Sequence, residues 1–266
     1  MKTAIITGSL GLVGSEAVHF IATAGFRILG VDNDMRRHFF GDEASTEWNR
    51  KILEEKYPSY NHFPWDIRSE EDMNRLFAEN NSDIKLIIHA AGQPSHNWAE
   101  GDPSTDFTIN ANGTMNLLEM TRKYCPDAVF IYLSTNKVYG DRPNLLPLIE
   151  KESRWELEET HPFFRKGIDE SMSLDDSTHS LFGVSKTAAD LLVQEYGRTF
   201  KIKTFEKSNI KNTILFETSN IQKSALYDSL KQNIAVNMLL SGVLPTSGHF
   251  RVNKGGRGLK IVGIGF

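Results

Sequence analysis

The sequence predicts an α/β fold built on a doubly wound parallel sheet. An apolar run at residues 4–7 ends in the pattern Gly8-x-x-Gly11-x-x-Gly14, which opens a helical segment. Further apolar runs alternate with helical segments, as in sheets whose strands are buried on both faces. These runs cover residues 27–31, 85–91 and 128–133. Such an order is typical of the Rossmann arrangement.

The first β-α-β unit has the pattern of a dinucleotide site. Gly8 permits a sharp turn off the strand, Gly11 lets the backbone approach a pyrophosphate, and Gly14 lets the helix pack close to the sheet. Asp32 ends the second strand, where an acid accepts the adenosine ribose hydroxyls and repels a 2′-phosphate. NAD is therefore expected in preference to NADP, although arginines at positions 36 and 37 offer that phosphate a site.

The other elements are expected from periodicity and capping residues. Ser69 precedes a run of acids and caps a helix that continues through residue 78. Residues 64–68 resemble a short strand end, and residues 93–106 a polar loop. Helices are also expected at residues 45–56, 109–124 and 181–200, the last of them after a long loop that contains prolines.

Composition and charge bound the class of protein. The chain has 266 residues and a net charge of −4, which suits one large α/β domain, or one with a small second lobe. Its single cysteine, Cys125, excludes a disulfide framework and a thiolate metal site, so it is expected as buried filler and no metal is assigned. No signal peptide or membrane span is recognised, and a cytoplasmic location is expected. Residues 201–266 hold ten Lys/Arg and three Asp/Glu, interpreted as solvated charges rather than a membrane or nucleic-acid surface.

Motifs spread over the first 204 residues resemble one known family. They are Thr7-Gly8-x-x-Gly11-x-x-Gly14, Asp32-Asn33, Asp66-Ile67, His89-Ala90-Ala91-Gly92, Asn110-x-x-Gly113-Thr114, Ser134-Thr135 before Val138-Tyr139-Gly140, and Ser185-Lys186. Together they resemble the extended short-chain dehydrogenase/reductase family, in its nucleotide-sugar epimerase/dehydratase branch. Within that branch, residues 134–141 and 183–190 most resemble the 2-epimerases of CDP-paratose and CDP-tyvelose.

The resemblance implies a role for each matching position. Residues implied to hold NAD are Gly8, Gly11, Leu12, Val13, Gly14, Asp32, Asn33, Asp66, Ile67, Ala90, Ala91, Gly92, Asn110 and Lys186. Residues implied to bind the substrate are Gln93, His96, Thr135 and Asn136. Thr135 would hydrogen-bond the sugar hydroxyl that is oxidised. Lys186 would hold the nicotinamide ribose and lower the pKa of a catalytic tyrosine four residues earlier.

The catalytic position four residues before Lys186 departs from the family, because Phe182 stands there. In this chemistry a tyrosinate removes the hydroxyl proton while hydride passes to the nicotinamide, and phenylalanine cannot take a proton. Losing a general base typically costs about 10²–10⁴-fold in rate. We hypothesise that His96 or Tyr139 substitutes. Asn136 stands where the family's 4,6-dehydratases place an acid, which disfavours dehydration and leaves epimerisation or plain oxidation.

These observations predict a NAD-binding domain at residues 1–204 and a divergent segment at residues 205–266. That segment matches no family motif, and we hypothesise a replaced or frame-shifted end, an incomplete substrate lobe, and a helix at residues 224–240. The predicted function is an NAD-dependent nucleotide-sugar epimerase. The alternatives are a non-catalytic or degenerate NAD-binding protein and a simple sugar-nucleotide dehydrogenase. Helices at residues 109–124 and 184–200 resemble the family's dimer interface, so a homodimer is expected.

Overall fold

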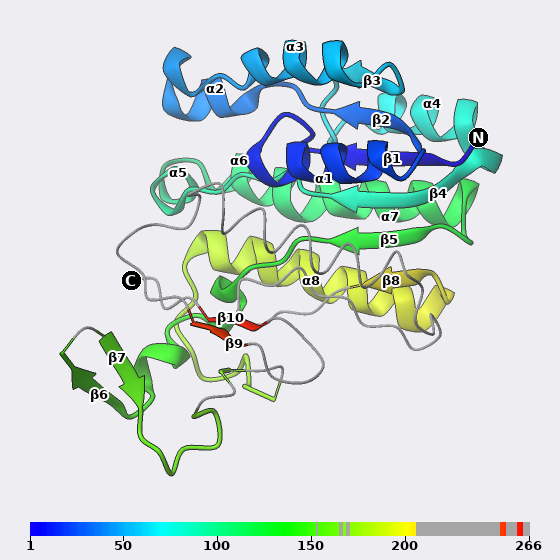
Figure 1. The fold of residues 1–266 in the computed structure, drawn as a ribbon. Helices are drawn as coiled ribbons and strands as arrows, with labels where there is room; N and C mark the ends of the chain where they lie inside the picture. The colour runs from blue at the N-terminus through cyan, green and yellow to red at the C-terminus, as the bar shows by residue number, and fades with distance from the viewer. Residues whose placement is uncertain (153, 165–166, 169–170, 206–250, 254–259, 263–266) are drawn as a thin grey trace.

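A six-stranded parallel sheet forms the centre of the protein in the computed structural model (Figure 1). The structure describes residues 1–152, 154–164, 167–168, 171–205, 251–253 and 260–262. The strand order β3-β2-β1-β4-β5-β8 changes direction between β1 and β4, and the predicted doubly wound fold is confirmed. In that order the strands are Tyr60–Phe63, Arg27–Val31, Thr3–Thr7, Ile84–His89, Val129–Tyr132 and Lys203–Phe205.

Helices cover both faces of the sheet because successive strand residues, which point to opposite faces, are apolar alike. Ile6 of β1 packs in a core cluster with residues of α1 and α3, on one face. Its neighbour Ile5 packs in a second cluster with residues of α4, α7 and α8, on the other face. These helices are α1 at Leu12–Thr23, α3 at Glu47–Lys56, α4 at Glu70–Asn80, α7 at Gly113–Tyr124 and α8 at Leu181–Phe200.

Shorter elements surround this framework. Three are short helices: α2 at Met35–Phe40, α5 at His96–Gly101 and α6 at Pro103–Phe107. A π-helical turn, η3 at Thr108–Asn112, joins α6 to α7. The 3-10 turns are η1 at Asp42–Ala44, η2 at Asn81–Asp83, η4 at Asn136–Tyr139 and η5 at Arg142–Leu145. Two further sheets each contain two antiparallel strands: β6 (Leu148–Lys151) pairs with β7 (Arg154–Leu157), and β9 (Arg251–Asn253) pairs with β10 (Lys260–Val262).

The structure corrects three expectations. The strand expected at residues 64–68 lies earlier, as β3, because Pro64 has no amide hydrogen with which to extend the ladder. The loop expected at residues 93–106 contains α5 and α6. Ser95 accepts a hydrogen bond from the amide of Trp98, and Asp102 accepts one from the amide of Thr105, so each helix begins at a side-chain cap. The long loop after residue 140 contains the β6–β7 hairpin.

Cys125 follows the last residue of α7 and is buried, as predicted, in the cluster that holds Ala128 and Phe130. Burial raises the pKa of its thiol to about 12. Within the described residues, no group of histidine, cysteine and acidic side chains is arranged to hold a metal ion. No helix among them is long and apolar enough to cross a membrane.

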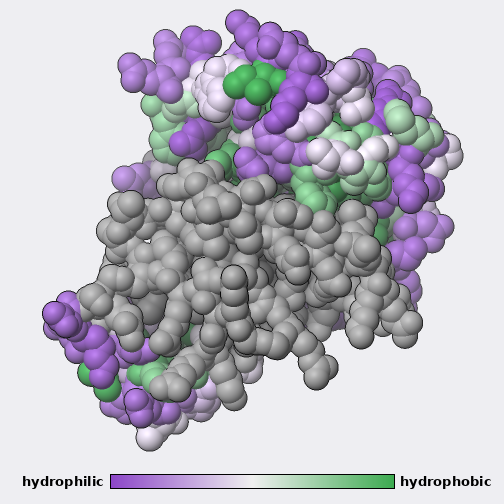
Figure 2. Space-filling model, in the orientation of Figure 1, coloured by the Kyte–Doolittle hydropathy of each residue, from purple (hydrophilic) through white to green (hydrophobic). Residues whose placement is uncertain are grey.

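Helices α7 and α8 pack against each other, and both expose apolar side chains, among them Met115, Val184 and Leu191. The homodimer expected through these helices stays a prediction. The segment at residues 205–266 and its helix at residues 224–240 lie outside the described residues, apart from Phe205, β9 and β10. Figure 2 shows polar side chains over much of the described surface on one side of the molecule.

Replacing Gly14 with alanine is expected to destabilise the fold. A Cβ atom there would lie 1.9 Å from the carbonyl oxygen of Gly8, and only a movement of α1 away from the sheet would relieve this clash. Overpacking of this kind typically costs about 1–3 kcal/mol of the free energy of unfolding. Gly101→Ala at the end of α5 is a matched control, because its Cβ would meet nothing within 4 Å. Urea denaturation compares the two variants, and equal midpoints would contradict the close packing.

Candidate active site

A pocket lies at the carboxyl ends of β1, β2, β3 and β4, where the strand order changes direction. Open α/β sheets bind ligands at this place. Apart from Asn110 and Lys186, every residue predicted to hold the cofactor lines the pocket. These are Gly8, Gly11, Leu12, Val13, Gly14, Asp32, Asn33, Asp66, Ile67, Ala90, Ala91 and Gly92. The pocket wall also contains side chains that the sequence did not single out: Met35, Phe39, Thr46, Trp65 and Ile109.

The turn between β1 and α1 brings backbone against backbone. Gly8 has a φ of +66°, and a Cβ on it would lie 2.7 Å from the amide nitrogen of Ala91 at the end of β4. The amide of Gly11 donates to the carbonyl of Gly8 at 3.1 Å. Gly11 precedes α1, whose first turn has neither a side-chain cap nor an acid. The first amides of the helix are therefore available to an anion, as in a pyrophosphate site.

Asp32 stands at the end of β2 and is held by two backbone amides. Its Oδ2 accepts from the amide of Leu10 at 3.0 Å, and its Oδ1 accepts from the amide of Asp34 at 2.9 Å. Burial raises the pKa of this carboxyl, and these two hydrogen bonds oppose that effect. Each oxygen retains a further lone pair. The position therefore suits acceptance of ribose hydroxyls.

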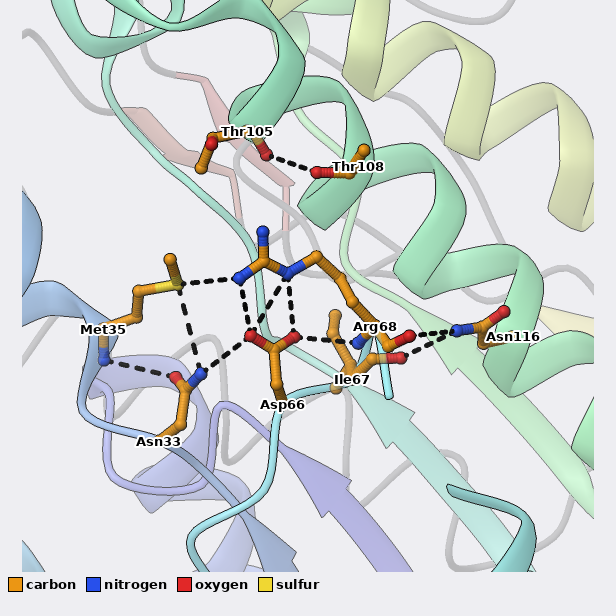
Figure 3. A network of polar contacts seen from close by, with 8 residues as sticks. All are labelled: Asn33, Met35, Asp66, Ile67, Arg68, Thr105, Thr108 and Asn116. Carbon is orange, nitrogen blue, oxygen red and sulfur yellow. Dashed lines mark hydrogen bonds and ion pairs between the residues drawn. The ribbon is translucent and has the colours of Figure 1, made fainter. Parts of the chain in front are cut away.

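A polar network surrounds Asp66 at the end of the pocket formed by β2 and β3 (Figure 3). The guanidinium of Arg68 donates to both carboxylate oxygens, with Nη2 at 2.7 Å from Oδ2 and Nε at 3.0 Å from Oδ1. The amide of Asn33 donates to Oδ2 at 3.2 Å. Burial alone would raise the pKa of Asp66, but these hydrogen bonds outweigh burial and the pKa lies below its usual value.

Arg68 is a site residue that sequence reasoning missed. Its Nη2 also lies 3.9 Å from the sulfur of Met35, which lines the pocket. Asn116 of α7 donates to the carbonyls of Ile67 and Arg68, at 3.2 and 3.0 Å, and fixes the segment after β3 on the framework. The sequence signal that could have predicted its contact with Asp66 is the positive charge two positions after that carboxylate.

Lys186 is buried on α8 beside the carboxyl end of β5. Its Nζ donates to the carbonyl of Leu133 at 3.2 Å and lies 4.5 Å from the ring centroid of Tyr132. Burial lowers the pKa of Lys186 to about 8, against the opposing charges of two nearby aspartates. The same Nζ would lie 3.9 Å from a Cβ on Gly92, so the ammonium is close to the strand end that lines the pocket.

Thr135 precedes η4, which packs against α8. Its hydroxyl donates to Oδ1 of Asn136 and accepts from the amide of Lys137, both at 3.3 Å. The preceding residue, Ser134, donates to the carboxylate of Asp190 on α8. Of the two predicted catalytic residues, Lys186 thus lies on α8, and Thr135 lies directly before η4, which packs against α8.

Phe182 is buried on the first turn of α8, one helical turn before Lys186. Its ring meets the imidazole of His96 edge to face, with centroids 4.9 Å apart and planes at 61°. The fold therefore brings the position that lacks the family hydroxyl into contact with one of the two side chains expected to replace it.

Asn110 and Gln93 are buried in an internal network. Gln93 donates its amide to Oδ1 of Asn110 at 2.9 Å and its Nε2 to Asp106 at 2.9 Å. Asn110 donates to the hydroxyl of Ser185 on α8 at 3.0 Å. The cofactor contact of Asn110 and the substrate contact of Gln93 stay predictions. What the structure shows is that they tie the segment after β4 to α8, beside Lys186.

His89, at the end of β4, has both ring nitrogens occupied. The hydroxyl of Thr114 donates to the carbonyl of Asn110 at 2.6 Å, so it accepts from Nε2 of His89 at 2.9 Å. Burial, and after it the charge of Lys186, lowers the pKa of His89 to about 3, so the ring is neutral. With its proton on Nε2, Nδ1 accepts from the hydroxyl of Thr7 at 2.7 Å, and that hydroxyl accepts from the amide of Ala91 at 3.2 Å.

The model of the NAD dependent epimerase/dehydratase family matches residues 4–207 of the chain. The chain belongs to this family. Its cofactor is NAD, as the pattern from Gly8 to Asp32 predicts. The resemblance inferred from the motifs is thereby confirmed.

Relatives of the chain are epimerases by name. CDP-paratose 2-epimerase of Salmonella typhi is 33% identical over 229 residues, which cover 84% of this chain and 60% of the relative. A putative UDP-glucose 4-epimerase of Methanocaldococcus jannaschii is 27% identical, over 75% of this chain and 52% of that protein. The structure of UDP-glucose 4-epimerase from Thermus thermophilus in complex with NAD matches with a TM-score of 0.56 at 23% identity, covering 77% of this chain and 53% of that one. This structural likeness supports the fold, and the chain spans about half to three fifths of the length of these relatives.

Acid is expected to destabilise this family member through His89. The unfolded chain protonates the ring near the ordinary pKa of 6.5, whereas the folded protein does so only near the pKa of about 3. Between these values the unfolded state binds more protons, so the free energy of unfolding falls as pH falls, by up to about 1.4 kcal/mol per pH unit. His89→Gln is expected to be less stable at neutral pH but to lose part of this slope. Urea unfolding at a series of pH values measures both effects, and an unchanged slope would contradict a neutral buried ring.

Proposed function

We propose that the protein is an NAD-dependent nucleotide-sugar epimerase that acts on a CDP-linked sugar at C2. The observation that carries the proposal is the position of the Lys186 ammonium, which donates to Leu133 after β5 and lies close to Gly92 in the lining of the dinucleotide pocket. The relative from Salmonella typhi, a CDP-paratose 2-epimerase by name, supports the choice of CDP-sugar.

The residues of the pocket fit NAD. The close approach of backbone at Gly8 leaves no room for a Cβ atom. The start of α1 has no side-chain cap, so its first amides can donate to the pyrophosphate. Asp32 would accept the adenosine ribose hydroxyls. Asp66 and Ile67 would take the adenine, and Arg68 would keep the Asp66 carboxylate ionised and in place. When bound, NAD would supply reversible hydride transfer at the sugar carbon.

The chain's own residues would bind and orient the reacting sugar. Thr135 would turn its hydroxyl from Asn136 to the sugar oxygen at the carbon that is oxidised. Lys186 would hold the nicotinamide ribose, and its buried ammonium would favour negative charge at the sugar oxygen. Asn136 beside Thr135 cannot protonate a leaving hydroxyl, which favours epimerisation over dehydration.

Phe182 favours a second candidate, a non-catalytic NAD-binding protein. The side chain is buried where the reaction needs a proton acceptor, and it has no polar atom. Such a protein would keep the pocket and bind the cofactor without turnover. The two candidates therefore agree on binding and differ on chemistry.

NAD is expected to bind at least tenfold more tightly than NADP, a difference of about 1.4 kcal/mol. The Asp32 carboxylate repels a 2′-phosphate, and removing that repulsion with Asp32→Asn should narrow the ratio of the two dissociation constants. Glu43→Gln is the control, since it removes an exposed charge from nearby η1 without touching the pocket lining. Isothermal titration calorimetry gives both constants, and equal affinity of the unchanged protein for the two cofactors would refute the role of Asp32.

Turnover of CDP-paratose is expected when the NAD-loaded protein is supplied with this nucleotide sugar. Chromatography of the products should show the C2 epimer, and a reaction in D₂O should leave C2 without deuterium because the hydride returns from the cofactor. Lys186→Met should abolish turnover, whereas Lys51→Met on the exposed side of α3 should not. Stoichiometric release of NADH would identify a dehydrogenase instead. NAD binding without any product would identify the non-catalytic protein.

A further inference from the structure

His96 contacts α8 at Phe182, the position where the family has a tyrosine hydroxyl. It opens α5, whose start is fixed by the Ser95 cap. Its ring lies edge to face against Phe182 at a centroid distance of 4.9 Å. Because Phe182 and Lys186 are one turn apart on α8, the imidazole lies beside the same face of the helix as the ammonium.

The segment before His96 connects it directly with the cofactor pocket. Ala90, Ala91, Gly92 and Pro94 all line that pocket, and His96 follows Pro94 by two positions. This is the end of the pocket near Lys186, whose Nζ is close to Gly92, and not the end formed by Asn33 and Asp66. A sugar bound at the end of the pocket near Lys186 would therefore contact the start of α5.

The ring nitrogens of His96 are available for a proton. Within the described part of the chain neither nitrogen has a hydrogen-bond partner, in contrast to His89, where both are occupied. The other proton acceptor considered for this role, Tyr139, is buried in an apolar cluster with Val138 and Met172. The Thr135 hydroxyl is too weak a base. His96 is thus the better placed of the two expected substitutes.

We propose that His96 is the general base of this protein, and that it receives the sugar hydroxyl proton that a tyrosinate at position 182 would receive in the family. The proposal rests on the epimerase function proposed above. It makes Phe182 the apolar support of the imidazole, and it makes the exchange of tyrosine for phenylalanine a relocation of the base from α8 to α5.

The proton and the electrons balance in this scheme. The sugar O–H bond breaks and its proton goes to an unprotonated ring nitrogen of His96. The C–H bond breaks with its electron pair, as hydride to NAD, and a ketone remains. On the return step the carbon regains hydride on its other face, and the imidazolium gives the proton back to the oxygen. The net reaction inverts one carbon and consumes nothing.

The charges around His96 favour the neutral ring that a base requires. Burial lowers the pKa of His96, the charge of Lys137 on η4 lowers it further, and Glu100 on α5 itself opposes both. On α6 and α8, which also pack against α5, Asp106 accepts from Gln93 and Lys186 donates to Leu133. On α2, which meets α5 at Trp98, Arg37 pairs with Asp42, Arg36 lies over the ring of Phe40, and His38 packs against Trp98. Together these influences lower the pKa of His96, which favours the neutral ring.

Turnover of CDP-paratose by variants of the NAD-loaded protein tests the proposal. His96→Gln should lower kcat by about 10²–10⁴-fold while leaving the affinity for NAD unchanged. His19→Gln is the matched control. His19 is also a partly buried histidine with a lowered pKa, packed 5.4 Å from the ring centroid of Tyr57, and it lies on α1 away from the pocket lining.

A second variant distinguishes a base from a structural contact. Adding Phe182→Tyr to His96→Gln should raise kcat at least tenfold above that of His96→Gln alone, because the new phenol lies one turn from the Lys186 ammonium. The acid limb of the pH–rate profile should then move to higher pH, since a phenol takes over from an imidazole. With a merely structural role of His96, the His96→Gln variant alone would keep the acid limb of the unchanged protein.

A readout without turnover uses ¹⁵N spectra of the histidine rings, in which the His96→Gln variant identifies the His96 signal. Adding CDP-paratose to the NAD-loaded protein should shift the ring nitrogen signal of His96 and leave that of His19 in place. An unmoved His96 signal in a saturated complex overturns the proposal.

The failures of the two proposals are distinguishable. Full turnover by His96→Gln overturns the role of His96 and leaves the epimerase function standing. If the unchanged protein is inactive and Phe182→Tyr alone makes it active, the role of His96 is also overturned. The chain would then be an epimerase that has lost its general base. Inactivity of the unchanged protein and of every variant, with NAD bound, overturns the epimerase function and the proposal with it.

Discussion

The contact of backbone with backbone beneath the cofactor pocket constrains the rest of the structure. Gly8 lies against Ala91 at the end of β4, and Gly14 of α1 lies against the carbonyl of Gly8. Since no side chain fits between these segments, the start of α1 and the exit of β4 have one relative position. The start of α1 fixes where a pyrophosphate can bind, and the exit of β4 fixes where the chain leaves the sheet toward His96.

Two buried polar networks extend this constraint from β1 to α8. His89 joins Thr7 of β1 to Thr114 of α7, and Asn110 joins Gln93 to Ser185 beside Lys186. Each network satisfies its donors and acceptors away from water, where an unpaired group would cost about 1–3 kcal/mol. The elements that surround the candidate site are thus held by hydrogen bonds as well as by apolar packing, and the site is largely formed before any ligand binds.

What could be predicted from the sequence depended on signals that are local. The glycine spacing, Asp32 and the apolar strands each occupy a few neighbouring residues, and they located most of the pocket correctly. Helix α5 was missed although its Ser95 cap was visible, because six residues are too few to show a helical period. The position of β3 was missed because Asn61 and His62 interrupt the apolar pattern of this strand.

Contacts between distant segments were beyond prediction for a different reason. Asn33 reaches the Asp66 carboxylate only because β2 and β3 are neighbours in the sheet. Phe182 was identified as a departure from the family, but its contact with His96 exists only where α5 meets α8. The family resemblance supplied roles for single positions. The structure supplied the neighbours that decide whether those roles can be filled.

The burial of Cys125 has a practical consequence for following this protein in solution. It is the chain's only cysteine, it is enclosed in the core, and its thiol pKa is about 12, so alkylating reagents have almost no thiolate to attack. A cysteine introduced at the exposed Asn97, next to His96, would be the one reactive thiol in the molecule. A fluorophore or spin label attached there would report movement of α5 without background from the rest of the chain.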